Sequence, residues 1–338
     1  MNRLKHLTCL AIALLASFGT SLQARTPSPV VVAYVISWSH QLPDPSLMTH
    51  INYAFGHVSA DFKHLTVQNP DRLRQIVALK RQNPKLRVVL SVGGWGAGHF
   101  SEMAASETNR RDFVQSCALV VRYFGLDGID IDWEYPTSGV AGISSAPGDS
   151  KNLTLLLRDL RQALGRGKVV SVATVAEAKF IDWAGSLPYL DFVNAMAYDM
   201  GTPPHHHASL YPSPHATYSC QQSIDAHLAA GVPAGKLVLG MPIYARGKRH
   251  QDPVLRDYAR TGSTGGRYTE RWDSIGQVPY LADSTGTLVL GCDNERSLTL
   301  KCRYARQRGL RGVMYWDYDS DNAMHSRTRA IAAEMLKQ

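Results

Sequence analysis

Short apolar runs rich in β-branched residues alternate with amphipathic stretches along nearly the whole chain. The runs have the length of buried strands, and the stretches between them have the period of helices. Eight strands that alternate with helices predict an α/β fold, a (β/α)8 TIM barrel. The competing fold is an open doubly wound sheet, but no Gly-x-Gly-x-x-Gly segment follows an early run. Strands are predicted at 30–37, 50–56, 87–92, 128–133, 168–174, 192–198, 237–243 and 312–316, and helices at 70–82, 106–123, 151–164 and 218–230.

One predicted strand carries a row of acids. Residues 126–136 read LDGIDIDWEYP, so that Asp130, Asp132 and Glu134 occupy alternate positions. Alternate residues of a strand share a face, and the other face here is apolar. Carboxyl groups this close raise each other's pKa, as a general acid near neutral pH requires. The alternative is an edge strand with a solvated acidic face, but the apolar opposite face favours a buried catalytic strand.

Polar and aromatic residues gather at the predicted carboxyl ends of the strands, where TIM barrels hold their active sites. Aromatic planes suit the apolar faces of sugar rings, although a single Trp in a strand is more often part of a core. Several at one end of a barrel favour a carbohydrate site. The residues concerned are Trp38, Ser91, Trp95, Glu134, Tyr198, Asp199, Tyr244 and Trp316.

Three segments, in this order, resemble the motifs of the family 18 glycoside hydrolases, the chitinases and their relatives. Residues 91–95 read SVGGW, residues 127–134 give Asp-x-x-Asp-x-Asp-x-Glu, and residues 196–199 read MAYD. The resemblance extends over about 30–330. It implies a TIM barrel that hydrolyses β-1,4-linked N-acetylglucosamine polymers, chitin or chito-oligosaccharides, with retention and without a metal or cofactor.

The resemblance also implies substrate-assisted catalysis, in which the sugar's acetamido oxygen is the nucleophile. Glu134 would be the general acid and then the base, and Asp132 would hydrogen-bond the acetamido N–H. Asp130 would share a proton with Asp132, the alternative being a purely structural buried acid. Tyr198 would donate to the acetamido carbonyl. Asp127 falls outside the alternation and is expected to serve as a turn or hydrogen-bonding residue.

The same resemblance implies the substrate-binding residues. Trp316 would stack beneath the sugar ring, Met196 would share the floor of the cleavage subsite, and Asp199 would bind the sugar or tune the acid. Four further positions match residues of the family's acid network or neighbouring subsites, with core packing as the alternative for each: Tyr34, Ser91, Trp95 and Tyr244.

Two connections are longer than a barrel needs. Residues 137–149 are rich in Gly, Ser and Ala and are expected to form a rim over the cleft. Residues 245–311 hold three short strand patterns, at 267–272, 278–281 and 287–290, and predict a small α+β insertion at about 246–300, between strands 7 and 8.

A cluster of three histidines, at 205–207, follows the sixth predicted strand. Three consecutive histidines cannot easily face one ion, so we expect a polar rim of the sugar cleft rather than a metal site.

The first residues resemble an export signal. A basic start, an apolar run at 7–18 and a small-residue site ending at Ala24 predict a signal peptide over 1–24 and a secreted or periplasmic mature chain. The full chain carries a net charge of +8, and the loss of Arg3 and Lys5 leaves +6. The basic residues are scattered, which argues against nucleic acid as a partner. We expect a monomer without membrane contact after cleavage.

Export would permit disulfides among the remaining cysteines, although their pairing stays open. A structural zinc site is not expected, because no Cys-x-x-Cys occurs. The cysteines concerned are Cys117, Cys220, Cys292 and Cys302.

Three functions stay open besides hydrolysis of chitin. The fold would equally serve an endo-β-N-acetylglucosaminidase or a peptidoglycan-directed hydrolase. A non-catalytic chitin-binding lectin is the third, and family members of that kind have usually lost the acid. The presence of Glu134 therefore favours catalysis.

Overall fold

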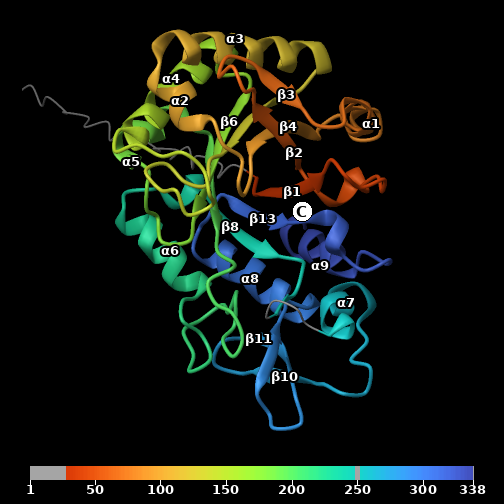
Figure 1. Cartoon of the computed structure of the whole chain (residues 1–338). Coiled ribbons are helices and arrows are strands. Elements are labelled where there is room, and N and C mark those ends of the chain that lie inside the picture. Colours follow the sequence, from red (N-terminus) through yellow and green to blue (C-terminus); the bar gives the residue numbers. More distant parts are fainter. Residues whose placement is uncertain (1–27, 248–251, 338) are drawn as a thin grey trace, which may run out of the picture.

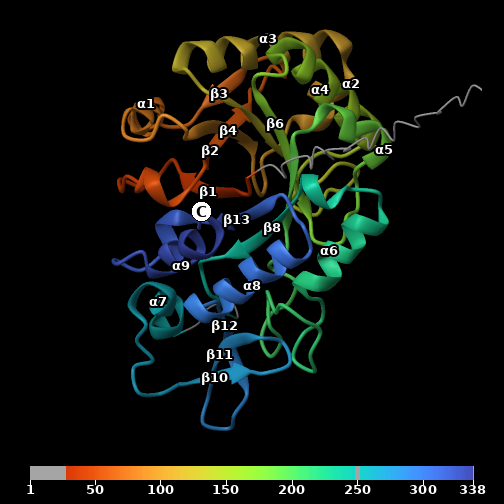
Figure 2. The ribbon, with the colours of Figure 1, turned by 180° about the vertical axis from the view of Figure 1, so that it is seen from behind.

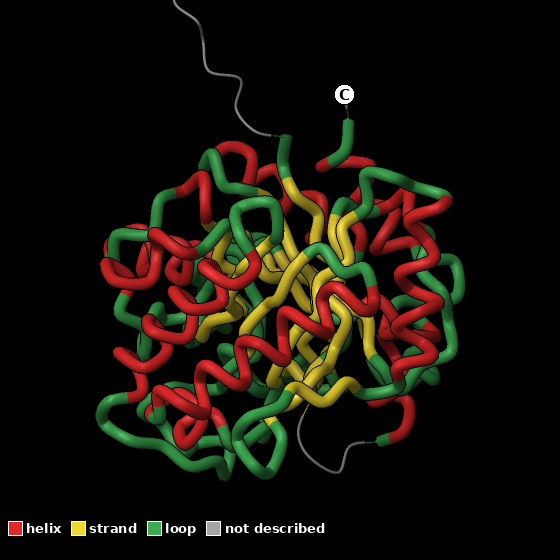
Figure 3. Tube along the Cα trace, turned by 90° about the horizontal axis from the view of Figure 1, so that it is seen from above, coloured by secondary structure: helices red, strands yellow, loops and turns green. Residues whose placement is uncertain are grey.

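Eight parallel strands close into a barrel in the computed structural model, which describes residues 28–247 and 252–337. The first strand pairs with both the second and the last, which closes the sheet and confirms the TIM barrel. Seen from above, the strands lie at the centre with helices around them (Figure 3). In chain order the barrel strands are β1 (Val30–Ile36), β2 (His50–Val58), β4 (Arg87–Gly93), β5 (Gly128–Asp132), β6 (Val169–Val175), β7 (Phe192–Met196), β8 (Leu237–Pro242) and β13 (Gly312–Trp316).

Each barrel strand is buried on both faces, which explains why the strands appear in the sequence as nearly continuous apolar runs. In β1 all seven residues are buried. Val31, Ala33 and Val35 pack outward in the large core between the strands and the helices. Val32 and Tyr34 point inward and pack in a second, smaller core inside the barrel. The period of two thus divides the strand between two cores.

The helices form the outer layer, with α3 and α4 side by side at one end of Figures 1 and 2. Local signals set their ends: the Ser106 side chain caps α3 by accepting from the Asn109 N–H at 3.3 Å, and Gly125 ends it in the left-handed conformation. All four predicted helices are confirmed. The helices are α1 (Pro70–Ala78), α2 (Phe100–Ala105), α3 (Glu107–Phe124), α4 (Asp149–Leu164), α5 (Trp183–Ser186), α6 (Cys220–Ala229), α7 (Pro253–Thr261), α8 (Glu295–Gln307) and α9 (Ser326–Met335).

The connection from β8 to β13 forms the predicted α+β insertion, drawn in cyan and blue below the barrel in Figure 1. Its antiparallel sheet has the order β10-β11-β12-β9. The three strand patterns predicted from the sequence are confirmed as β10, β11 and β12, and α7 lies between β9 and β10. The strands are β9 (Arg246–Gly247), β10 (Thr269–Asp273), β11 (Val278–Ala282) and β12 (Leu288–Gly291). A further strand, β3 (Leu65–Val67), forms a hairpin with β2 on the outside of the barrel.

Asp127 has a hydrogen-bonding role just before β5, as predicted. Its carboxylate accepts from Lys80 Nζ at 2.7 Å and from the Val88 N–H at 2.8 Å. It therefore ties the start of β5 to β4 and to the 3-10 helix Leu79–Arg81 that follows α1, at the amino-terminal edge of the barrel.

The cysteines form no disulfide among the described residues, where Cys117, Cys220, Cys292 and Cys302 are all buried and free. The predicted signal peptide lies outside the described residues. None of the helices within them has both the length and the hydropathy to cross a bilayer.

A buried ion pair fixes α8 to the chain before it. Lys301 Nζ lies 2.5 Å from Asp293 Oδ2, both side chains are fully buried, and Ser297 Oγ donates to the other carboxylate oxygen at 2.6 Å. Two charges out of water are tolerated only while each is paired.

We predict that Lys301→Met lowers the free energy of unfolding by about 3–5 kcal/mol, because the Asp293 carboxylate loses its cation inside the protein. Urea unfolding at pH 7 measures the change. Arg256→Met is the matched control, since its pair with Asp257 is exposed and should contribute less than about 1 kcal/mol. Equal losses in the two variants would contradict the role given to the buried pair.

Candidate active site

Asp130 lies inside the barrel, and its fully buried carboxylate receives hydrogen bonds from residues of four other strands. The register places Ser91 of β4 and Ser171 of β6 directly opposite it, and their hydroxyls donate at 2.8 and 2.6 Å. Tyr34 Oη donates at 2.8 Å and Asn194 Nδ2 at 3.1 Å. Burial raises the pKa of Asp130, and these donors partly offset that effect.

Asp132 lies one pleat nearer the open end and is also buried, with 4% of its surface exposed. Its Oδ1 has no hydrogen-bond partner among the described residues. Burial raises its pKa well above the usual range, and the charges of Glu134 and Asp130 raise it further. The site therefore favours a shared proton over a full row of carboxylates.

Glu134 lies just beyond the strand, because β5 ends at Asp132 rather than at the predicted residue 133. It is half-buried and faces the cleft. Burial is the largest cause that raises its pKa to about 7; the charge of Asp199 raises it too, while a hydrogen bond with Tyr135 lowers it. A carboxyl group with this pKa can both give up and take a proton near neutral pH.

The SVGGW segment brings a neighbouring strand unusually close to these acids. Gly93 has a φ of +125°, and a Cβ there would lie 2.0 Å from the Asp132 carbonyl oxygen. A Cβ on Gly94 would lie 2.7 Å from the Phe55 ring. Only glycine fits at both positions, which gives the motif a steric reason.

A cleft of about 780 Å³ opens at the carboxyl ends of the strands. It contains every predicted site residue except Ser91 and Asp130, which lie beneath it. The predicted residues that line it are Tyr34, Trp95, Asp132, Glu134, Met196, Tyr198, Asp199, Tyr244 and Trp316. Trp38, which the sequence analysis placed among the aromatic residues at the strand ends, lines the cleft as well. The sequence analysis did not assign the other lining residues to the site: Phe55, Tyr135, Val175, Ala176, Glu177, Met200, Tyr218 and Arg246.

Aromatic rings form the floor and the rim of the cleft. Trp316 stacks on Phe55 with ring centres 5.5 Å apart and an 18° angle between planes. Trp38 and Trp95 are 61% and 64% exposed in the same cleft, and apolar surface gathered in a groove is typical of a ligand-binding site. Phe55 was missed because an apolar residue within a strand gives no signal beyond core packing.

Tyr198 and Asp199 follow β7 with opposite electrostatic behaviour. Burial, with the charges of Asp132 and Glu134, raises the pKa of Tyr198 well above 10, so its phenol stays a donor. Burial also acts to raise the pKa of Asp199, but hydrogen bonds from His207 and Tyr244 and nearby positive charge lower it overall. Asp199 therefore stays ionised.

The histidine cluster does not form the polar rim expected from the sequence. His206 and His207 are buried, with 0% and 1% of their surfaces exposed. His206 Nε2 lies 3.1 Å from Asp273 of β10, and His207 Nδ1 lies 3.4 Å from Asp199. The expectation failed because the insertion packs over this loop, a contact between distant segments that the local sequence does not reveal.

The loop at 137–149 is tied down by its last residue. Asp149 is fully buried in the first turn of α4, where its carboxylate accepts from Ser101 Oγ at 2.7 Å. It also accepts from the backbone N–H groups of Ala146 at 2.7 Å and Thr137 at 3.2 Å. Both ends of the loop are therefore held together against α2, and residues 137–149 are not among those that line the cleft.

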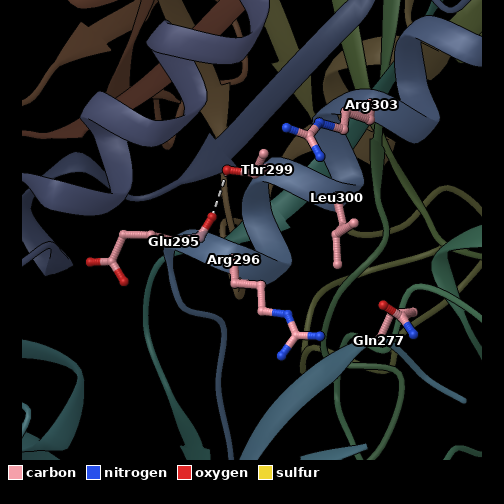
Figure 4. A pocket seen from close by; sticks show the side chains of 6 residues that line it. All are labelled: Gln277, Glu295, Arg296, Thr299, Leu300 and Arg303. Carbon is pink, nitrogen blue, oxygen red and sulfur yellow. Dashed lines mark hydrogen bonds between the residues drawn. The ribbon is translucent and has the colours of Figure 1, made fainter. Parts of the chain in front are cut away.

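A second hollow of about 400 Å³ lies on the outer face of α8 (Figure 4). Its long side chains come from α8 and from Gln277, away from the carboxyl ends of the strands. Arg296 lies over the Trp272 ring at 3.9 Å, and Arg303 pairs with Glu334 at 3.2 Å. These contacts are typical of a surface groove, so the cleft at the barrel end is the candidate active site.

Comparisons with known proteins agree with this geometry. The model of the glycosyl hydrolases family 18 matches residues 30–321. Chitotriosidase-1 of Mus musculus is 30% identical over 346 residues, which cover 86% of this chain and 73% of that protein. Chitinase A1 of Niallia circulans is 31% identical over 297 residues, or 74% of this chain, and the match spans only 42% of its length.

The fold has close counterparts among solved structures. A family 18 N-acetylglucosaminidase from Paenibacillus barengoltzii superimposes with a TM-score of 0.81 at 33% identity, covering 91% of this chain and 100% of that one. Together with the family model's match to most of the chain, this shows that the chain belongs to family 18 of the glycosyl hydrolases and is a chitinase-like glycoside hydrolase.

Proposed function

We propose that the protein hydrolyses β-1,4-linked N-acetylglucosamine polymers, chitin or its oligosaccharides, by substrate-assisted catalysis. The observation that carries the proposal is the stack of Asp130, Asp132 and Glu134 beneath an aromatic cleft, with the pKa of Glu134 raised to about 7. Relatives named as chitinases, among them chitinase A1 and probable chitinase 2, support the choice of substrate.

In the first step, protonated Glu134 gives its proton to the glycosidic oxygen as the bond to the anomeric carbon breaks. The acetamido oxygen of the same sugar forms the new bond to that carbon, giving a cyclic oxazolinium-type intermediate. Asp132 accepts a hydrogen bond from the acetamido N–H, and Tyr198 donates one to the acetamido oxygen. Water then opens the ring, giving its proton to Glu134 with net retention.

Several features of the site support these roles. Neighbouring carboxyls in one strand cannot flank a sugar from both faces, so a protein nucleophile opposite Glu134 has no candidate on β5. Asp130, supplied with four donors, can take up charge when Asp132 turns toward the substrate. Trp316 offers the stacking surface, and Met196 and Tyr244 line the same cleft. Tyr34 and Ser91 serve the acid network through Asp130.

The second candidate is an endo-β-N-acetylglucosaminidase or a peptidoglycan hydrolase with the same chemistry. A family 18 structure from Paenibacillus barengoltzii that is described as an N-acetylglucosaminidase supports this alternative. A lectin role is disfavoured because Glu134 faces the cleft in a titratable state. The composition of residues 1–24 supports action outside the cell on such polymers.

We predict that Glu134→Gln lowers kcat by about a hundredfold or more and leaves sugar binding intact, because the amide has the same shape but no transferable proton. Reducing-sugar assays on chitin oligomers, with N-glycoprotein and cell wall in parallel, would identify the substrate as well. Glu107→Gln, an exposed change in α3, is the control. Wild-type turnover in Glu134→Gln would overturn the assignment of the acid.

The pH profile should reflect the charge of Asp199. Glu134 acts as the acid below its pKa of about 7, so kcat/KM should fall as pH rises through 7. Asp199→Asn removes a charge that raises this pKa and should move the descending limb to lower pH, whatever it does to binding. Asp71→Asn, on the exposed side of α1, should leave the limb in place. A limb that stays put in Asp199→Asn would contradict this coupling.

The acetamido nucleophile can be tested with an inhibitor and two variants. A thiazoline mimic of the cyclic intermediate should bind more tightly than the substrate. Asp132→Asn and Tyr198→Phe should each lower kcat more than they raise KM, because both contacts tighten as the acetamido oxygen nears the anomeric carbon. Phe substitution at exposed Tyr123 is the control for Tyr198. A covalent sugar adduct on Asp130, Asp132 or Asp199 would instead reveal a protein nucleophile.

A further inference from the structure

The loop after β7 folds back on itself and presents two buried histidines in opposite directions. The Met200 N–H donates to the His207 carbonyl at 3.0 Å, and the His206 N–H donates to the His215 carbonyl at 2.7 Å. These bonds hold residues 200–215 as an arch, called the histidine arch below, between the cleft wall and the insertion. His206 faces the insertion through Asp273, while His207 faces the cleft wall through Asp199.

The His207 ring has a polar contact at one of its two nitrogens. Its Nδ1 lies 3.4 Å from Asp199 Oδ1, and Nε2 has no hydrogen-bond partner among the described residues. The ring packs edge-on against Tyr244, with centres 5.4 Å apart. On another side is Gly291 of β12, where a Cβ would lie 3.1 Å from the histidine Cδ2. The absence of a side chain at Gly291 therefore leaves room for the imidazole ring, whose Nδ1 faces Asp199.

Asp199 needs such support because its backbone has a φ of +56°, a left-handed conformation that costs free energy for a residue with a side chain. Its carboxylate is held by Tyr244 Oη at 2.6 Å and Arg246 at 2.6 Å in addition to His207. The cation Arg246 comes from β9, and Tyr244 comes from the segment between β8 and β9. None of these groups belongs to the acid strand. The same carboxylate lines the cleft, and its charge acts on Glu134.

We propose that His207 is a positioning residue, which donates its Nδ1–H to Asp199 and fixes that carboxylate at the cleft wall for sugar binding and for tuning of Glu134. His206 supports the arch from the other side: its Nε2 meets Asp273, which also accepts from the backbone N–H groups of Ile275 and Gly276 at 2.9 Å each. The insertion sheet is thereby coupled to the catalytic acid. The inference rests on the proposed function for its kinetic part only.

Two variants separate donation from packing. His207→Phe keeps a buried ring without a donor, and His207→Gln keeps an N–H donor in a smaller side chain. On chito-oligosaccharides, kcat should fall about tenfold in His207→Phe, as expected for loss of one hydrogen bond to a charged group, and stay within about threefold of wild type in His207→Gln. In an Asp199→Asn background, His207→Phe should have almost no further effect on kcat.

A readout without substrate keeps the inference testable even if the proposed function fails. With ¹³C-labelled aspartate, the pKa of the Asp199 carboxyl should rise in His207→Phe, because the charged form loses a donor, and should stay near the wild-type value in His207→Gln. Groups facing this carboxyl, Tyr244, Arg246 and Glu134, are the same in all variants. An unchanged Asp199 titration, or equal kcat losses with and without Asp199→Asn, would overturn the inference. An inactive wild type with a shifted Asp199 titration would overturn the proposed function alone.

Discussion

Burial of carboxyl groups inside the barrel is the constraint on which the rest of the site depends. Asp130 is tolerated there because parallel register brings hydroxyl and amide donors from four neighbouring strands to one point. Asp132 has no such compensation at Oδ1, so its cost of ionisation remains high. The protonated forms of Asp132, inside the barrel, and of Glu134, at the cleft, are therefore favoured.

The carboxyl groups of the cleft are separated by environment into two kinds. Burial in a site with few donors keeps the pKa of Glu134 and Asp132 high, as proton transfer requires. Hydrogen bonds and the Arg246 guanidinium keep the pKa of Asp199 low. The cleft therefore combines a fixed negative charge on Asp199 with an acid, Glu134, that can gain and lose a proton near neutral pH.

The insertion contributes to the electrostatics of the cleft as well as to its walls. Arg246 on β9 reaches the cleft, and β10 and β12 enclose the histidine arch behind Asp199. The barrel supplies the acids, whereas the insertion and the loop after β7 supply the groups that hold one acid ionised. A short connection between β8 and β13 would complete the barrel but would leave Asp199 without the Arg246 guanidinium.

The sequence by itself determined the eight strands, the insertion strands and the acid row, because strand periodicity and apolar runs are local properties. It also placed Glu134 among the residues at the carboxyl ends of the strands. Only the tertiary structure decided the partners of Asp130, the stacking of Phe55 under Trp316, and the burial of His206 and His207. Those contacts join segments far apart in the chain. They follow from barrel closure, strand register and the docking of the insertion. None of these three features produces a local pattern of apolar and polar residues in the sequence.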